Sequence, residues 1–113
     1  MDKSLRDKLL LEKIVSQILA IQQFSENIDF CTFEQNEMIQ KAIYMSFIII
    51  GESANRLSEE TTEKYPDTPW PTIVAFRNII AHDYFDLDHS IAWDSIKIDI
   101  PLLFAQINKI LGK

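Results

Sequence analysis

The sequence predicts an all-α protein, an up-and-down bundle of four main helices with a kinked last helix, and a short fifth helix as an alternative. Two observations predict this class: apolar residues recur at spacings of three and four over long stretches, and only two of the 113 residues are glycine. With 47% hydrophobic and 25% charged residues, the chain resembles compact globular proteins in composition. Its length suits one domain, residues 1–113, that buries a core without metal or disulfide support.

The first helix is expected to begin at Ser4, a residue type that caps helix N-termini, and to end near Asn27. Its apolar residues recur at helical spacing, so we expect one buried face that consists of Leu5, Leu9, Ile14, Ile18 and Ile21.

The second long helix is expected over residues 36–58, after a capping-box pattern at residues 32–35 that opens a short helical turn. Residues 43–50 are apolar almost all round, which predicts a central position. Gly51 costs a helix roughly 1 kcal/mol relative to alanine, so we expect a close helix contact or a bend there. Glu52 follows this apolar run and is expected to pair with Arg77; the alternative is a surface glutamate on the polar edge of the helix.

Residues 59–71 are rich in proline, threonine and acidic residues and are expected to form a loop between helices. Thr68 as N-cap and Pro69 in the first turn then open a third helix that ends at His82 or Asp83.

A turn is expected at residues 85–88, followed by an N-cap at Asp88 or Ser90. The fourth helix then runs from about residue 89 to 111. Pro101 removes a backbone donor within it and is expected to kink it near Lys97.

The segment FRNIIAHDYF, residues 76–85, places Arg77, Asn78, His82 and Tyr84 within eight positions. Arginine clamps phosphates, histidine transfers protons near neutral pH and tyrosine supplies a hydroxyl, which together suit phosphodiester chemistry. At about 100° per residue, Asn78 and His82 face away from the apolar stripe, and Arg77 lies at its border. Asn78 precedes His82 by four positions and can orient the imidazole, and Tyr84 can turn its hydroxyl back over His82. The alternative from spacing alone is a structural cluster that caps the helix end.

Other catalytic arrangements find little support in the sequence. The acidic segment after His82, with His89, lacks the glycine and terminal glutamate of a calcium loop, so its aspartates are expected to shape a turn and a cap. Cys31, Ser46 and Ser53 have no neighbouring base, and no glycine-rich phosphate loop occurs. We therefore expect no metal and no cofactor.

The net charge and the length of the apolar runs indicate which binding partners and which cellular compartment suit this protein. The net charge of -6 leaves too few cations for a broad basic surface, so any nucleic-acid site must concentrate a few cations locally, for example by pairing two copies. The longest apolar run, residues 47–50, is too short to span a membrane. The mixed-charge start is unlike a secretory signal, and the lone Cys31 cannot form an internal disulfide, so we expect a cytoplasmic protein.

The spacing of Arg77, His82 and Tyr84 resembles the signature of the HEPN superfamily, and specifically of the HepT-like toxins of MNT/HEPN toxin-antitoxin modules. The resemblance extends over nearly the whole chain, through the segments IIIGESANRLSEE, PDTPWPTIVAFRNIIAHDYF and IAWDSIKIDIPLL.

The resemblance implies a homodimer in which two copies of the motif face one cleft and cleave RNA without a metal. His82 matches the acid/base position, Arg77 the position that stabilises charge on the phosphorane, and Asn78 their polar neighbour. Tyr84 matches the tyrosine that the cognate minimal nucleotidyltransferase, the antitoxin, modifies with AMP. We expect the apolar part of the dimer interface to include Ile79 and the fourth helix.

Three functions follow from this reading. The first is a toxin ribonuclease. The second is a noncatalytic partner module that binds, and is modified by, the nucleotidyltransferase; the acidic charge favours it, because weak affinity for RNA does not impair a protein-binding role. Asp83, between His82 and Tyr84, can repel a phosphate and is expected to slow the ribonuclease. The third is a structural helical dimer in which the motif only caps a helix.

Overall fold

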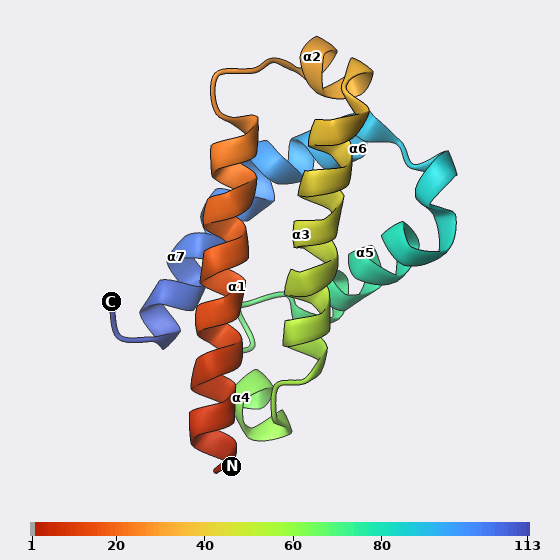
Figure 1. Cartoon of the computed structure of the whole chain (residues 1–113). Coiled ribbons are helices and arrows are strands. Elements are labelled where there is room, and N and C mark those ends of the chain that lie inside the picture. The colour runs from red at the N-terminus through yellow and green to blue at the C-terminus, as the bar shows by residue number, and fades with distance from the viewer. Residues whose placement is uncertain (1) are drawn as a thin grey trace.

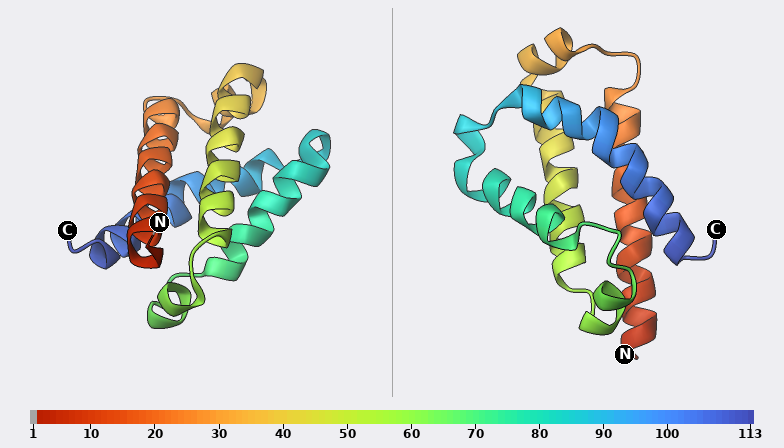
Figure 2. Two further views of the ribbon diagram at one scale, coloured as in Figure 1. Left: turned by 60° about the horizontal axis from the view of Figure 1, so that its bottom comes forward. Right: turned by 180° about the vertical axis from the view of Figure 1, so that it is seen from behind.

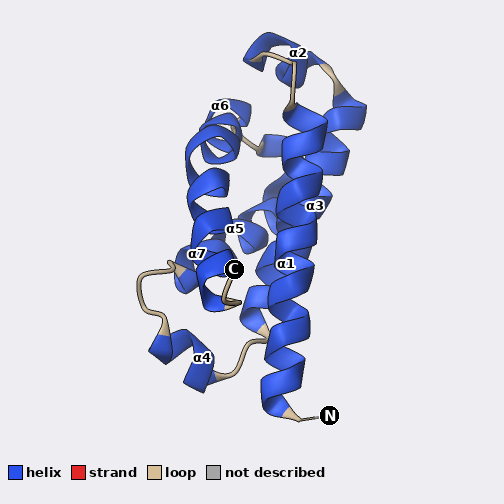
Figure 3. Cartoon of the chain, turned by 90° about the vertical axis from the view of Figure 1, so that its left-hand side faces the viewer, coloured by secondary structure: helices blue, strands red, loops and turns tan. Residues whose placement is uncertain are grey.

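The computed structural model describes residues 2–113, and within them every regular element is a helix (Figure 1, Figure 3). The all-α prediction is confirmed. The elements are α1 (Lys3–Ser25), α2 (Phe30–Gln35), α3 (Glu37–Asn55), α4 (Glu59–Lys64), α5 (Trp70–Asp83), the 3-10 turn η1 (Tyr84–Asp86), α6 (His89–Asp94), the π-helical segment η2 (Ser95–Asp99) and α7 (Ile100–Ile110).

Helix α3 is the central element of the bundle, as its apolar run predicts. It packs against α1 on one side and α5 on the other, and the continuous segment α6–η2–α7 crosses behind and reaches α1 (Figure 1, Figure 2). The fully buried side chains are mostly isoleucines from each of the long helices: Ile14, Ile18, Ile21, Ile43, Ile50, Ile80, Ile100 and Ile107. No helix within residues 2–113 is long and apolar enough to cross a bilayer.

The predicted face of α1 is correct from Ile14 onward and wrong before it. Leu5 and Leu9 are 48% and 46% exposed, whereas Leu10 and Leu11 are buried. Leu9 lies five positions before Ile14, which places it about 140° away from the buried stripe.

Two predicted helix starts, those of α1 and α2, are wrong because a neighbouring residue supplies the cap. Asp2 rather than Ser4 caps α1, and it accepts a hydrogen bond from the backbone N–H of Ser4. Asp29 caps α2 by accepting from the N–H of Thr32, at 2.8 Å. A carboxylate at these positions also interacts favourably with the positive end of the helix dipole.

Residues 59–64 form helix α4, so the prediction of a continuous loop is wrong there. Helix α3 ends at Asn55, and Ser58, expected as the end of that helix, instead caps α4. Two glutamates in the first turn, Glu59 and Glu60, stabilise this short helix through its dipole.

Helix α5 ends at Asp83, as predicted, but Thr68 does not cap it. The N-cap residue is Pro69 and has no side-chain cap; Thr68 is buried, and its carbonyl accepts from the Trp70 N–H at 2.8 Å. The indole N–H of Trp70 donates to the carbonyl of Tyr65, which fixes the entry into the helix.

The last helix contains the predicted irregularity. Asp88 caps α6, accepting from the N–H groups of Ser90 and Ile91, so this prediction is confirmed. The helix then widens into the π turn Ser95–Asp99, in which the Ile100 N–H bonds to the Ser95 carbonyl. Pro101 follows directly and has no N–H to offer, so the disruption falls around Lys97 as expected.

Candidate functional site

Gly51 allows helices α3 and α5 to approach closely at Arg77. A Cβ atom at position 51 would lie 2.2 Å from Arg77 Cβ and 2.8 Å from Arg77 Cγ. No side chain fits in that space without moving one helix. Of the two predicted reasons for this glycine, the structure shows the close helix contact, and it is a contact with a residue of the motif.

The Arg77 guanidinium is held by two neighbours. One terminal nitrogen lies 3.0 Å from a carboxylate oxygen of Glu52, and the other donates to Asn78 Oδ1 at 2.9 Å. The predicted ion pair is therefore present, with the two side chains 31% and 51% exposed. At that exposure the pair adds at most about 1 kcal/mol to stability, so its main effect is on the orientation and charge of the arginine.

The Nε atom of Arg77 is buried and, among residues 2–113, has no hydrogen-bond partner. An unmade hydrogen bond of a buried donor costs roughly 1–3 kcal/mol. The two terminal nitrogens of the guanidinium are thus held by Glu52 and Asn78, whereas its Nε–H donor is left without an acceptor among the described residues.

His82 is exposed in the last turn of α5 and takes part in none of the hydrogen bonds found within residues 2–113. The predicted arrangement, in which Asn78 orients the imidazole, is not present: the Asn78 carbonyl oxygen binds Arg77 instead. The imidazole is consequently open to solvent and to a ligand. The helix-capping alternative also finds no hydrogen bond from His82 to the terminal carbonyls in the described residues.

Tyr84 does not turn back over His82. Its half-buried ring packs edge-on against the ring of Tyr44 from α3, with 5.8 Å between centroids. Burial raises the pKa of the Tyr84 hydroxyl above its usual value, and the carboxylate of Glu37 raises it further. The hydroxyl is therefore harder to ionise than that of an exposed tyrosine.

Sequence reasoning missed the pair formed by Tyr44 and His89. The Tyr44 hydroxyl lies 2.6 Å from His89 Nδ1, and the two rings stack. Burial, followed by the charges of Tyr84 and Asp88, raises the pKa of Tyr44. A tyrosine within an apolar helix needs a partner for its hydroxyl, but the sequence does not show that the partner is 45 residues away.

A second missed cluster surrounds Asp7, which is buried. Its carboxylate accepts hydrogen bonds from the backbone N–H of Ser58 and from the hydroxyls of Ser58 and Thr61. Burial pushes the pKa of Asp7 upward, but these hydrogen bonds outweigh it and the pKa is lowered overall. The cluster joins α1 to the start of α4. The pattern of a serine followed by two glutamates could have revealed the cap, but not its link to Asp7.

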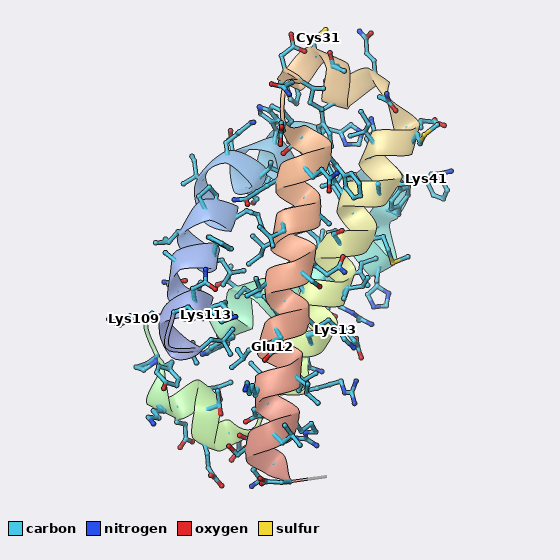
Figure 4. The ribbon with its side chains drawn as sticks, turned by 60° about the vertical axis from the view of Figure 1, so that its left-hand side comes forward. Glu12, Lys13, Cys31, Lys41, Lys109 and Lys113 are labelled. Carbon is cyan, nitrogen blue, oxygen red and sulfur yellow. The ribbon has the colours of Figure 1, made fainter. Side chains whose placement is uncertain are left out.

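No group of three or more His, Cys, Asp or Glu side chains within residues 2–113 lies close enough to hold a metal ion. Cys31 is exposed on α2. Of the cations labelled in Figure 4, Lys109 and Lys113 lie together at the C-terminal end, Lys13 lies on α1 and Lys41 lies on α3.

The fold and site together define a class: a small helical domain with an arginine and an exposed histidine on helix α5 and a tyrosine in the turn that follows it, as in HEPN ribonucleases. The comparisons with known proteins identify the family. The model of the family described as "Ribonuclease HepT-like" matches residues 14–110. The chain therefore belongs to the HepT-like ribonuclease family.

Three relatives illustrate this similarity. A provisionally named RNase of Methanocaldococcus jannaschii is 33% identical over 100 residues, which cover 88% of this chain and 92% of that protein. A provisionally named RNase of Caldanaerobacter subterraneus subsp. tengcongensis is 32% identical over 103 residues, 91% of this chain and 92% of that one. A provisionally named ribonuclease HepT of Thermococcus cleftensis is 30% identical over 100 residues, 88% and 91% of the two chains. No solved structure matches this chain significantly.

Proposed function

We propose that this protein is the toxin of a toxin-antitoxin module, a metal-independent endoribonuclease whose site is completed by a second copy of the chain. The observation that carries the proposal is the placement of Arg77 and His82 in one helix, with the guanidinium held in place and the imidazole exposed and unpaired within the described residues. Membership in a ribonuclease family gives this pair its substrate.

The reaction uses the RNA's own 2′-hydroxyl as nucleophile. The neutral imidazole of one His82 takes the 2′-hydroxyl proton, the 2′-oxygen bonds to the adjacent phosphorus, and the bond from phosphorus to the 5′-oxygen breaks. The protonated His82 of the second copy gives its proton to the departing 5′-oxygen. The products are a 2′,3′-cyclic phosphate and a 5′-hydroxyl, and Arg77 stabilises the charge that develops on the phosphorane.

Exposed apolar side chains beside the motif support the homodimer. Ile79 on α5 is 50% exposed, and three residues of the last helix, Ile91, Ile98 and Leu102, are 58%, 66% and 57% exposed. Ile79, Ile91 and Leu102 line an apolar groove of about 340 Å³ between α5 and the α6–α7 segment. A second copy that covers this face brings its own motif close to the first. The pairing also doubles the number of Arg77 guanidinium groups in one cleft, which an acidic chain requires to attract RNA.

The partner we propose for Tyr84 is a minimal nucleotidyltransferase that acts as the antitoxin. The Tyr84 oxygen attacks the α-phosphorus of ATP, pyrophosphate leaves, and a base of the transferase takes the phenolic proton. A phenol is protonated at neutral pH, and burial and Glu37 raise the pKa of this one further, so we expect the transferase to supply that base. AMP two residues from His82 adds negative charge and bulk where the RNA phosphate would lie, which silences the site.

RNA cleavage by purified variants tests the proposal. Wild-type protein in EDTA is expected to cleave single-stranded RNA and leave a 2′,3′-cyclic phosphate, whereas H82A and R77A lose at least about 100-fold in kcat, the usual range for a proton-transfer group or a charge-stabilising donor. R56A, which removes an exposed arginine at the end of α3, is the matched control and retains full activity. A 2′-O-methyl oligonucleotide lacks the nucleophile and stays intact. Wild-type protein that cleaves no RNA, or an H82A variant as active as wild type, refutes the enzymatic proposal.

The acidic net charge supports a second candidate, a noncatalytic module that presents Tyr84 to the nucleotidyltransferase. Coexpression with the adjacent gene followed by intact-mass measurement separates the two. If Tyr84 carries AMP and neither the modified nor the unmodified protein cleaves RNA, the result favours the module. AMP that abolishes an activity present in the unmodified protein favours the toxin.

A further inference from the structure

Phe85 is the most exposed large apolar residue among those described, with an exposed fraction of 96%. It lies in the η1 turn that follows α5, three residues after His82. In the views of Figures 1 and 2 this turn is at the edge of the bundle, across α3 from α1. A fully exposed phenyl ring beside the proposed catalytic histidine is therefore free to receive a planar ligand.

The Phe85 ring is the outer end of a row of aromatic rings anchored in the core. It meets the Tyr84 ring edge-on, with 5.5 Å between centroids, and Tyr84 in turn meets the ring of Tyr44. Tyr44 is 1% exposed and bonded to His89. The row therefore places the exposed Phe85 ring next to rings that are fixed in the core.

The surroundings of Phe85 are acidic. Asp86 follows it directly, Asp83 precedes it by two positions, and both are exposed. Carboxylates repel phosphate groups, and they are depleted at the core of protein interfaces. They do accept hydrogen bonds from the amino and imino groups of nucleobases. An exposed ring with two exposed carboxylates close to it in the sequence thus fits the uncharged face of a base better than a phosphate or an apolar protein surface.

We propose that Phe85 is a base-stacking residue that binds an unpaired base of single-stranded RNA next to the scissile phosphate. This inference rests on the proposed ribonuclease function and names how the substrate is held. Stacking on an aromatic ring tolerates all four bases and needs no basic surface. It therefore supplies affinity that a chain of net charge -6 cannot obtain from the phosphates.

Binding of a cleavage-resistant probe tests the inference without relying on turnover. The probe is a 2′-O-methyl oligonucleotide with one 2-aminopurine, whose fluorescence falls when the base stacks. F85A is expected to weaken its binding about 5- to 150-fold and to reduce the quenching, and F85W to preserve both. F85L keeps an apolar side chain without an aromatic face and is expected to behave as F85A. F24A, which truncates a partly exposed phenylalanine on α1, is the matched control and binds as wild type.

Three results overturn the inference. F85A that binds the probe as tightly as wild type, or F85L that binds as tightly as F85W, shows that no stacking occurs. F85A that lowers the oligomeric state in analytical ultracentrifugation shows that Phe85 belongs to a protein interface. If wild-type protein cleaves RNA while F85A binds normally, only the stacking role fails. If wild type neither binds nor cleaves RNA, the proposed function fails with it.

Discussion

Substitution of Gly51 by alanine tests how the scaffold positions Arg77. The new Cβ would lie 2.2 Å from Arg77 Cβ, whereas ordinary contacts begin at 3.4 Å, so α3 and α5 must separate by about 1.2 Å. Overpacking of this kind costs about 1–3 kcal/mol. The clashing Cβ of Arg77 cannot move without its backbone, so the cost lies in the upper part of this range, at about 2–3 kcal/mol. Helix propensity returns about 1 kcal/mol, because alanine is the better helix former. The net expectation for G51A is a loss of about 1–2 kcal/mol in the free energy of unfolding.

Urea unfolding of four proteins separates the clash from other effects. The clash is with Arg77 Cβ, so R77A cannot relieve it but R77G can. We expect R77G to destabilise the wild-type background by about 1 kcal/mol through helix propensity, and to be neutral or stabilising in the G51A background. G112A is a control, since a Cβ there meets nothing within 4 Å and only its positive φ is unfavourable. The reasoning is refuted if G51A is as stable as wild type, or if R77G costs the same in both backgrounds.

Three further predictions concern side-chain contacts. E52Q changes the free energy of unfolding by no more than about 1 kcal/mol, because its pair with Arg77 is half exposed. The substitution frees the guanidinium and is expected to lower KM for RNA. A loss of kcat as large as that of R77A contradicts this role of Glu52. D7N lowers stability by about 1–3 kcal/mol at neutral pH. The Asp7 pKa lies below its ordinary value of 3.8, so the contribution of Asp7 to the free energy of unfolding is complete above about pH 4 and disappears as pH falls through the folded-state pKa. In the acid range the free energy of unfolding should therefore fall less steeply with decreasing pH for D7N than for wild type. An equal slope contradicts the role of the Asp7 carboxylate. Y44F leaves His89 Nδ1 without its partner and costs about 1 kcal/mol in urea unfolding; a variant as stable as wild type contradicts the bond.

The helices were predictable where apolar residues recur at helical spacing over a long stretch of sequence. The burial of Ile14, Ile18 and Ile21, the central position of α3 and the end of α5 all follow from periodicity and turn chemistry. Helix starts were less predictable, because several residues that can cap stand close together. At the start of α1 both Asp2 and Ser4 can accept the hydrogen bond, and only the register of the folded helix selects Asp2.

The residues of the site were predictable from the sequence, but only some of the contacts between their side chains were. The pair between Glu52 and Arg77 was expected because a carboxylate beside an apolar run needs a cation. The orientation of Asn78 was not, since position i+4 offers His82 and position i-1 offers Arg77, and the stronger, charge-assisted bond goes to the arginine. Tyr84 was misplaced because its partner, Tyr44, comes from another helix 40 residues earlier in the chain.

The adjacent residues Gly51 and Glu52 act on one side chain in two different ways. Gly51 sets the distance between the helices, and so the position of the Arg77 backbone, while Glu52 sets the direction of its guanidinium and neutralises its charge. A phosphate that approaches Arg77 must therefore compete with Glu52 for the same nitrogen rather than enter an open positive site. Competition of this kind keeps an isolated acidic chain a weak ligand for nonspecific RNA. It also makes binding depend on a second contact near His82, which is the role we assign to the ring of Phe85.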